Sequence, residues 1–336
     1  MKMLFFDFTE SERSFFEKTD LKDFEIEFIT GPLNENTVLT EEQLENTDAV
    51  SVFITSNLTE SVLGRFKNLR IVSTRSTGYN HIDIKYCRTY HIAVFNVSSY
   101  GSTSVAQYTM MLLLALVRNL KSAYQGIKNH NPDYTKYTGR DIDSMSLGII
   151  GGGSIGCAVG KLAEAFGMTV YINSLEKNPE AECYAKYLNF EDILELSDII
   201  TLHIPYKSEL FHMIGRNEIS RMKDGVYIIN TARGELIDSS ALYEGLAGGK
   251  IKGAALDVFE CENLSVKGGE IPLNLEVYDK ECISNALIAQ KLFDFDNVIL
   301  TPHIAYNTQE SIEKILEISF NNLRDYCKGM HTNQIY

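Results

Sequence analysis

The sequence lacks the features that are typical of nucleic-acid-binding and metal-binding proteins. Basic residues are too few for a nucleic-acid-binding face, because 31 Lys and Arg against 45 Asp and Glu give a formal net charge of −14. The six cysteines form no CxxC pair and show no zinc-ligand spacing, which predicts reduced thiols and no bound metal. What these absences leave is an ordinary globular protein with a solvated acidic surface.

Long apolar runs, repeats and low-complexity tracts are also missing. The longest apolar run, 110–117, is far shorter than the ~20 residues that span a bilayer. The N-terminal segment reaches Asp7 too early for a signal peptide. We therefore expect a cytoplasmic protein that does not enter a membrane. With 336 residues the chain is too long for one ordinary core, and two domains are expected.

Short apolar runs alternate with helical patterns along most of the sequence. The expected strands are 3–7, 25–29, 49–54, 71–73, 94–96, 170–173, 199–203, 226–230, 253–257 and 298–301. The expected helices include 58–66, 82–90, 190–196, 218–222, 239–247 and 308–326. This alternation predicts an α/β fold with doubly wound parallel sheets, arranged as two Rossmann-like or flavodoxin-like domains.

The middle of the chain indicates how these elements divide into domains. A long apolar helix is expected over 104–120, with Ser104 as its cap, and a polar, turn-rich stretch follows at 126–146. Residues 263–290 read as an irregular insertion. We expect a substrate domain of 1–100 plus 304–336 and a dinucleotide-binding domain of 101–303. Crossings near Tyr100 and His303 would then place a cleft between the domains.

A glycine-rich turn follows an apolar run at 147–150 and precedes a helical pattern. Its spacing is Gly151-x-Gly153-x-x-Gly156, the order that a dinucleotide-binding turn requires. Gly151 permits the turn, Gly153 lets the backbone approach a pyrophosphate, and Gly156 lets helix and strand pack closely. The following helix would present free N–H groups to the phosphates.

Three groups that could act on a substrate follow predicted strands. They are Arg233, Glu262 and His303. A guanidinium can bind a carboxylate and a carbonyl, a histidine can donate a proton, and a carboxylate can orient that histidine. Taken singly, each has a plainer interpretation: a surface ion pair, a solvated charge or a turn contact, and a His–Glu pair could also be two metal ligands. Together, in a chain with a nucleotide-binding turn, they favour hydride transfer to a 2-keto acid.

Four blocks, 151–156, 230–238, 253–262 and 301–306, resemble the D-isomer-specific 2-hydroxyacid dehydrogenases in composition, order and spacing. The resemblance spans nearly the whole chain. Segments 73–83, 108–112, 117–122 and 303–306 resemble most the D-lactate dehydrogenase branch, including its VanH-type members. The resemblance implies an NAD(P)-dependent dehydrogenase with pyruvate and D-lactate as the expected substrate pair, and a homodimer formed through the cofactor domain.

The resemblance also assigns roles to residues. Arg233 binds the substrate carboxylate and carbonyl, His303 is the acid–base group, and Glu262 pairs with His303. The other implied substrate contacts are Thr77, Gly78, Tyr100 and Tyr306. The implied cofactor contacts are Gly151, Gly153, Ser154, Ile155, Gly156, Ser174, Lys177, His203, Pro205, Thr231, Ala232 and Asp257.

One position departs from the NAD-specific members of this family. Ser174 stands where they carry an aspartate for the adenosine ribose hydroxyls, as it does in the VanH-type enzymes. Without that carboxylate a 2′-phosphate is not repelled, and Ser174 and Lys177 could contact it. Glu176 and Leu175 argue against this, since a basic residue would suit a phosphate better. We expect NAD or NADP, with NADP favoured by Ser174.

Two alternatives to a D-lactate dehydrogenase stay open. The first is a reductase for another 2-keto acid of the 2-hydroxyisocaproate, phenyllactate or hydroxypyruvate type. The second belongs to another class: relatives of this fold serve as NAD(H)-sensing corepressors that bind peptide partners and keep the Arg–Glu–His trio. Turnover of a 2-keto acid separates an enzyme from such a binding protein.

Overall fold

The chain folds into two compact units, which the sequence predicts as two α/β domains. In the computed structural model, one unit comprises Met1–Tyr100 with Asn307–Tyr336 and the other comprises Gly101–Tyr306. The structure describes residues 1–98, 100–130, 133–262 and 280–336. The return crossing therefore lies between Tyr306 and Asn307, a little later than the expected boundary at 303–304.

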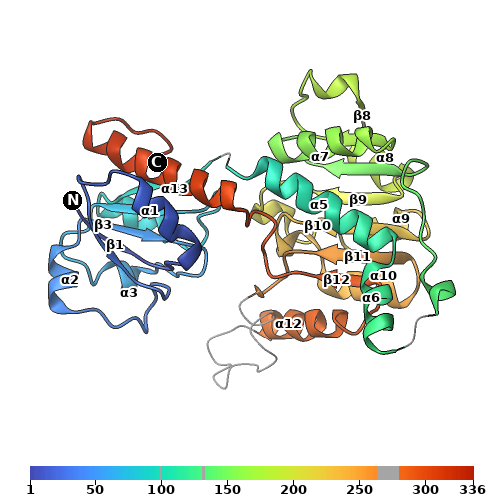
Figure 1. The fold of residues 1–336 in the computed structure, drawn as a ribbon, viewed down its shortest axis with the longest axis horizontal. Coiled ribbons are helices and arrows are strands. Elements are labelled where there is room, and N and C mark those ends of the chain that lie inside the picture. Colours follow the sequence, from blue (N-terminus) through green and yellow to red (C-terminus); the bar gives the residue numbers. More distant parts are fainter. Residues whose placement is uncertain (99, 131–132, 263–279) are drawn as a thin grey trace. The chain divides into compact units, whose positions relative to one another are not determined.

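The first unit is built on a five-stranded parallel sheet with strand order β2-β1-β3-β4-β5. This order is that of flavodoxin-like folds. Its elements are β1 (Lys2–Phe5), α1 (Arg13–Lys18), β2 (Glu25–Phe28), α2 (Glu41–Asn46), β3 (Ala49–Val52), α3 (Glu60–Leu63), β4 (Ile71–Thr74), α4 (Ile84–Thr89), β5 (Ala93–Phe95) and α13 (Gln309–Cys327). The C-terminal helix α13 returns to this unit, where Leu316, Phe320 and Leu323 share a core with Met3 and Phe5 (Figure 1).

The second unit is built on a seven-stranded parallel sheet with strand order β12-β11-β10-β9-β6-β7-β8. The order extends in both directions from β6, which is the Rossmann arrangement. Its elements are α5 (Ser102–Val117), α6 (Leu120–Lys128), β6 (Ser146–Ile150), α7 (Ser154–Ala165), β7 (Thr169–Asn173), β8 (Ala185–Tyr187), α8 (Phe190–Leu196), β9 (Ile199–Leu202), α9 (Arg216–Arg221), β10 (Val226–Asn230), α10 (Ser239–Ala247), β11 (Ile251–Leu256), α12 (Lys280–Leu292) and β12 (Val298–Leu300).

Helices cover both faces of this sheet, which explains why its central strands are apolar throughout. Met110 and Leu113 of α5 share one core with Val159 and Ala163 of α7. The opposite core contains buried side chains from α8, α9, α10 and α12, among them Ile193, Ile219, Leu242 and Leu292. Figure 1 shows α5 and α7 side by side and α12 below the β12 edge. The predicted fold class, two parallel-sheet α/β domains, is confirmed.

The structure corrects three expectations about the second unit. Helix α5 begins at Ser102 with Gly101 as its N-cap, so Ser104 lies inside the helix rather than capping it. The turn-rich stretch after it contains the end of α6 and a short 3-10 helix, Tyr134–Tyr137. Residues 280–290, expected to be irregular, belong to helix α12; the rest of that expected insertion, 263–279, lies outside the described residues.

The cysteines do not all stay reduced as expected. Cys261 and Cys282 form a disulfide with a Cα–Cα distance of 5.7 Å. They lie 21 positions apart in sequence, and α12, which packs against α10, places Cys282 beside Cys261. The expectation of reduced thiols therefore holds only for Cys87, Cys157, Cys183 and Cys327.

Candidate active site

The glycine turn joins β6 to α7 at the point where the strand order reverses. Gly151 has a φ of 110°, and a Cβ there would lie 2.4 Å from the backbone oxygen of His203, at the end of β9. A Cβ on Gly156 would lie 1.8 Å from the oxygen of Gly151. Gly151 therefore requires glycine for its backbone conformation and for the nearby backbone of His203, and Gly156 requires it because α7 approaches the turn so closely.

Gly153 differs, because a Cβ there would meet nothing within 4 Å. It is the N-cap of α7 and has an ordinary φ of −72°, so no contact within the protein requires glycine. The first turn of α7, with the exposed Ser154 and half-buried Ile155, presents its N–H groups at this open surface. Open space at a helix N-terminus beside a glycine is what a pyrophosphate needs, so these residues fit a dinucleotide.

The residues predicted to lie near the adenosine ribose of the cofactor, Ser174 and Lys177, follow β7. Ser174 lies against Gly152, whose Cβ would be 2.8 Å from that of Ser174. Lys177 is exposed, and its ammonium lies over the Tyr187 ring, 5.6 Å from the centroid. Leu175, between them in sequence, is fully exposed.

His203 and Pro205 follow β9, and only the proline is exposed. Desolvation lowers the pKa of His203 to about 3, so the imidazole is neutral at physiological pH. Its Nε2 atom lies 3.0 Å from the Thr201 hydroxyl. The histidine that follows β9 is therefore uncharged.

Arg233 follows β10 in a loop that buried side chains hold in place. Asn230, which is 1% exposed, donates to the backbone oxygen of Arg233 and accepts from the N–H of Ala232. The guanidinium donates to the oxygen of Ala232 at 2.6 Å, which leaves other N–H groups for a ligand. Gly234 lies directly against Phe259, at the end of the neighbouring segment. Sequence reasoning missed Asn230, although its position at the strand end was visible.

Glu262 and His303 form a hydrogen-bonded pair that joins the segments after β11 and β12. His303 Nδ1 lies 3.0 Å from Glu262 Oε2, and the two side chains are 24% and 31% exposed. His303 has a φ of 55°, a left-handed conformation that non-glycine residues adopt at a cost of about 1 kcal/mol. Since Nδ1 is engaged, Nε2 is the nitrogen that can exchange a proton with a substrate.

Asp257, predicted to contact the cofactor, has its carboxylate bonded to the loop that carries His303. Its Oδ1 accepts from the Thr301 hydroxyl at 2.5 Å and from the N–H of Ile304, and its Oδ2 accepts from the N–H of Ala305. Burial raises the pKa of this carboxyl, although these hydrogen bonds oppose the change. The structure thus gives Asp257 a part in placing His303, and its contact with the cofactor stays a prediction.

Helix α5 adds two residues to this edge that sequence reasoning did not select. Thr109 Oγ1 lies 3.1 Å from Thr231 Oγ1, beside the buried Ala232. Tyr108 is hydrogen-bonded to Thr301, and burial raises its pKa. The polar residues of an otherwise apolar helix were the available signal.

The predicted substrate contacts belong to both units. In the first unit, Thr77 and Gly78 follow β4 in a loop, where Asn96 donates to the oxygen of Thr77. Within the described ranges the N–H groups of Thr77 and Gly78 have no acceptor, as carboxylate binding would require. Tyr100 is the last residue of the N-terminal part of the first unit, and Tyr306 is the last residue of the second unit. Both are half-buried.

Two features are absent from the residues that the structure describes. No group of three or more His, Cys, Asp or Glu side chains there is arranged to hold a metal ion. No helix in the same ranges combines the length and apolar character needed to cross a membrane.

Comparison with known proteins gives consistent matches. The family model for the NAD-binding domain of D-isomer-specific 2-hydroxyacid dehydrogenases matches residues 110–305. The chain is 35% identical to an aromatic 2-oxoacid reductase of Clostridium sporogenes over 291 residues, 85% of each chain. It is 36% identical to a D-specific alpha-keto acid dehydrogenase of Enterococcus faecium over 282 residues, 82% of each chain.

A solved structure matches almost the whole length. D-Lactate dehydrogenase from Aquifex aeolicus, complexed with NAD and lactic acid, has a TM-score of 0.84 and 34% identity, with 99% of this chain and 98% of that chain covered. The residues that match the family model, 110–305, include the glycine turn together with Arg233, Glu262 and His303. From these matches and this geometry, the chain belongs to the D-isomer-specific 2-hydroxyacid dehydrogenase family.

Proposed function

We propose that this oxidoreductase reduces a small 2-keto acid to the D-2-hydroxy acid, with pyruvate and D-lactate as the substrate pair. The observation that carries the proposal is the Glu262–His303 pair at 3.0 Å, which joins the segments after β11 and β12, while Arg233 follows β10, the neighbour of β11. The D-lactate dehydrogenase of Aquifex aeolicus, bound to NAD and lactic acid, supports this choice of substrate. Relatives named for aromatic 2-oxoacids and for hydroxypyruvate make those acids the competing substrates.

The bound nicotinamide cofactor supplies the hydride, and the chain binds, orients and protonates the keto acid. Arg233 binds the carboxylate and carbonyl oxygens through the N–H groups not used by Ala232. His303 Nε2 donates a proton to the carbonyl oxygen as it becomes an alkoxide, and Glu262 stabilises the protonated ring through Nδ1. Thr77, Gly78, Tyr100 and Tyr306 are the other substrate contacts in this proposal.

A panel of 2-keto acids tests this proposal. The kcat/KM values for pyruvate, 2-ketobutyrate, phenylpyruvate and hydroxypyruvate should be highest for pyruvate, with D-lactate as product. Arg233→Lys should raise KM more than it lowers kcat, since a point charge replaces a planar fork. No oxidation of NADH or NADPH with any of the four acids would favour the NAD(H)-sensing binding protein instead.

NADP use is the second part of the proposal, and it rests on Ser174. Its hydroxyl lies beside Gly152 at the phosphate turn, where a carboxylate would repel a 2′-phosphate. The kcat/KM for NADPH should therefore equal or exceed that for NADH. Ser174→Asp should lower it for NADPH by about a hundredfold and leave NADH little changed. A hundredfold preference of the unmodified protein for NADH would contradict the idea.

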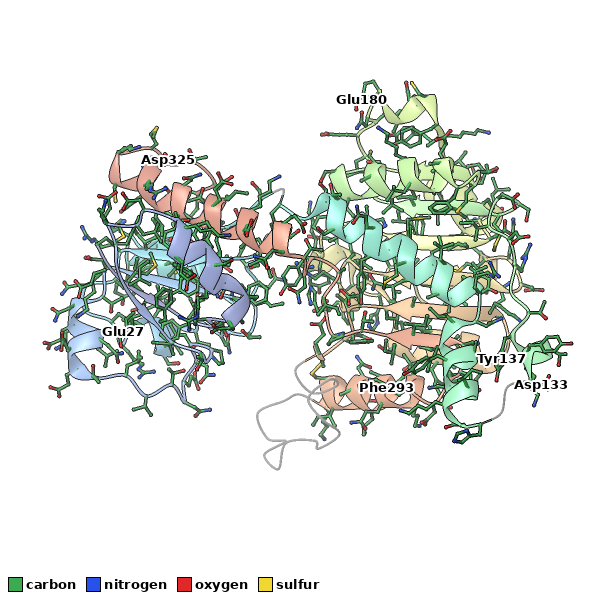
Figure 2. The ribbon with its side chains drawn as sticks, in the orientation of Figure 1. Glu27, Asp133, Tyr137, Glu180, Phe293 and Asp325 are labelled. Carbon is green, nitrogen blue, oxygen red and sulfur yellow. A yellow bond between two sulfur atoms is a disulfide. The ribbon has the colours of Figure 1, made fainter. Side chains whose placement is uncertain are left out.

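Homodimerisation through the second unit is the third part. Leu120, Tyr124 and Ile127 lie on one face of α6 and are 59%, 69% and 66% exposed. Phe293, just past the end of α12, is also half exposed (Figure 2). Sedimentation should give a dimer, and Tyr124→Glu with Ile127→Glu should give a monomer.

A cytoplasmic location stays a prediction, which cell fractionation tests.

A further inference from the structure

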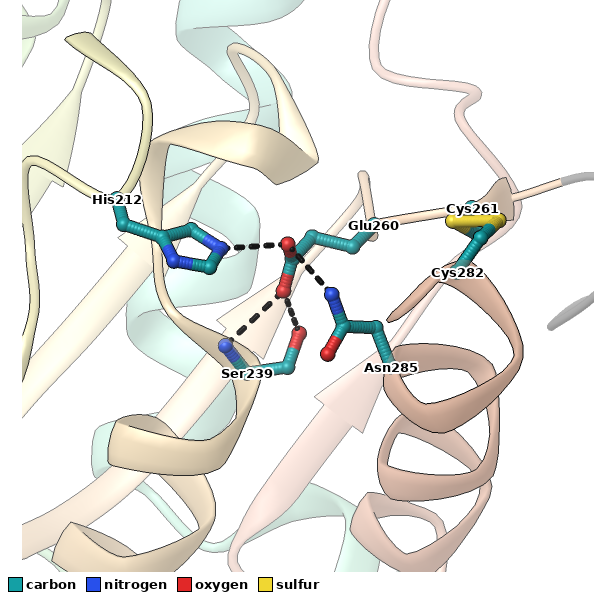
Figure 3. The surroundings of a disulfide bond; sticks show 6 residues. All are labelled: His212, Ser239, Glu260, Cys261, Cys282 and Asn285. Atoms are coloured by element: carbon teal, nitrogen blue, oxygen red, sulfur yellow. Dashed lines mark hydrogen bonds and ion pairs between the residues drawn. A yellow bond between two sulfur atoms is a disulfide. The ribbon is translucent and has the colours of Figure 1, made fainter. Parts of the chain in front are cut away.

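A second carboxylate lies two residues before Glu262 and has entirely different surroundings. Glu260 is 3% exposed, whereas the side chain of Glu262 is 31% exposed. The Glu260 carboxylate accepts from His212 Nε2 at 2.7 Å, from Asn285 Nδ2 at 3.0 Å and from the N–H of Ser239 at 3.0 Å, and also from the Ser239 hydroxyl (Figure 3). These partners come from the segment before α9, from α12 and from the start of α10.

The four described groups that bond Glu260 are all able to donate, and only a carboxylate can accept from all four. A glutamine would turn an NH₂ group toward one pair of these donors and leave buried groups unpaired. Burying a carboxylate is costly unless several donors surround it, so the site is built for this side chain. The Glu260–Glu262 segment is therefore fixed at its first residue.

The middle residue of the segment is fixed covalently. Cys261 has a φ of 53°, in the left-handed region, and its Sγ is bonded to Cys282 in the first turn of α12. Asn285, one turn further along α12, is the residue that donates to Glu260. Figure 3 shows the disulfide and this hydrogen bond at the same end of α12. Glu260 and Cys261 are thus both attached to one helix.

Glu262 follows these two attachments directly. Its Oε1 accepts from the N–H of Phe259 at 3.3 Å, and its Oε2 pairs with His303. Phe259 in turn lies against Gly234, next to Arg233. A rotation of the backbone at 260–261 would therefore move the carboxylate away from His303. Other charged groups near the pair are Arg233 and Glu235, and Asp257 on the His303 side.

We propose that Glu260 is a positioning residue for the Glu262–His303 pair, and that the Cys261–Cys282 disulfide is the second attachment that holds Glu262 in place. The proposal rests on the proposed function only for the role of that pair in turnover. It predicts that losing either attachment weakens the pair while His303 itself stays in position, because Asp257 holds the His303 loop independently.

A double-mutant cycle tests the role of Glu260. Glu260→Gln should lower kcat/KM for pyruvate reduction by about tenfold and move the descending limb of its pH profile to lower pH. In a Glu262→Gln background the same change should cost less than about twofold, because Glu260 acts only through Glu262. An equal loss in both backgrounds would overturn the proposal.

A titration that does not depend on turnover separates this proposal from the proposed function. In protein labelled with ¹³C in its histidine rings, the His303 signal is assigned by its loss in His303→Asn. Its titration midpoint should move to lower pH in Glu260→Gln and stay in place in Asp198→Asn. Asp198 is a matched control, because it too is a carboxylate bonded to a serine N–H and hydroxyl, but at the start of β6 and β9.

An unmoved titration midpoint of His303 in Glu260→Gln would overturn the inference even if the enzyme is active. A moved midpoint in a protein that reduces no keto acid would sustain it.

His212→Asn serves if Glu260→Gln does not fold. It removes one partner of Glu260, and asparagine tolerates the φ of 53° at that position. The midpoint should move in the same direction by a smaller amount, and no movement would count against Glu260 as a positioning residue.

The disulfide is tested with a dithiol. Dithiothreitol transfers two electrons and two protons to the Cys261–Cys282 bond, giving two thiols and a cyclic disulfide of the reagent. Reduction should lower kcat/KM by about threefold and move the His303 midpoint in the same direction as Glu260→Gln. The double variant Cys261→Ser, Cys282→Ser should start at the reduced value and not respond to the reagent. Identical oxidised and reduced proteins would overturn this part.

Discussion

The segments that follow strands β6, β7 and β9 contain the glycine turn, Ser174 and the neutral His203, and we call this half of the sheet edge the glycine half. The segments that follow β10, β11 and β12 form the other half of the same sheet edge, which we call the charged half. They contain Arg233, Glu262 and His303, and the buried Asp257 holds the loop of His303. The first half is shaped by close backbone packing, since a Cβ on Gly156 would lie only 1.8 Å from the Gly151 oxygen. The second is shaped by side chains that hold one another, as the 3.0 Å hydrogen bond between His303 and Glu262 indicates.

The difference suits two kinds of ligand. A pyrophosphate needs many weak N–H donors in a fixed arrangement, which a helix start and glycines supply without a nearby carboxylate. A keto acid under reduction needs one proton and one guanidinium at defined positions, which requires charged side chains with fixed partners. Substitutions in the first half should therefore affect folding and cofactor affinity, and those in the second should affect turnover and pH dependence.

His303→Asn should have the largest effect on turnover in the charged half. Asparagine tolerates the left-handed backbone at this position but cannot deliver a proton, so kcat for keto-acid reduction should fall by about 10³-fold. Steady-state kinetics measure this, and a titration of NADH binding provides the control, which should be unchanged. A kcat within tenfold of the unmodified protein would remove His303 from the acid–base role.

Gly156→Ala and Gly153→Ala should separate folding from binding within the glycine half. A methyl group at 156 would collide with the Gly151 oxygen, and the unfolding free energy should drop by about 3 kcal/mol. A methyl group at 153 meets no protein atom, so the melting temperature should stay the same while cofactor affinity falls at least about tenfold. Thermal melts and cofactor titrations measure the two effects. Unchanged affinity in Gly153→Ala would mean that no phosphate approaches this glycine.

Glu262→Gln should change the pH dependence of turnover in the charged half. The amide keeps the size of the side chain but loses the negative charge that stabilises protonated His303. Because the protonated ring is the donor in keto-acid reduction, the descending limb of the kcat/KM profile should move to lower pH. At neutral pH the loss should be about tenfold. A profile with unchanged limbs would show that the pair does not govern proton transfer.

Local signals were enough to predict many elements of this fold. The bounds of β10, α8 and α10 match the sequence prediction. Each of the two helices begins at a side chain that caps it. Asn189 accepts from the N–H of Asp192, and Asp238 accepts from the N–H groups of Ser240 and Ala241. The glycine turn was likewise predictable, because its spacing reflects contacts made within a few residues.

Contacts between distant segments could not be read from the sequence. Helix α12 was missed because its polar and small residues, such as Ser284 and Asn285, gave no clear apolar period. Without that helix, nothing indicated that Cys282 would lie beside Cys261 or that Glu260 would be buried. Glu260 and Glu262 have the same residue type and nearly the same position in sequence, yet only tertiary packing decides that one is buried and the other faces His303.

His203→Gln should have the smallest effect, and it tests whether the glycine half is kept uncharged. The folded-state pKa of His203 is about 3, below its ordinary value of 6.5, so acid protonates the unfolded chain first. The folded state therefore loses stability as the pH falls below about 6.5. Between pH 7 and 5 the unmodified protein should lose about 1 to 2 kcal/mol more unfolding free energy than His203→Gln, measured by denaturant unfolding. If His203→Gln has the same slope as the unmodified protein, His203 takes up protons in the folded state as readily as in the unfolded chain, and the glycine half can carry a charge.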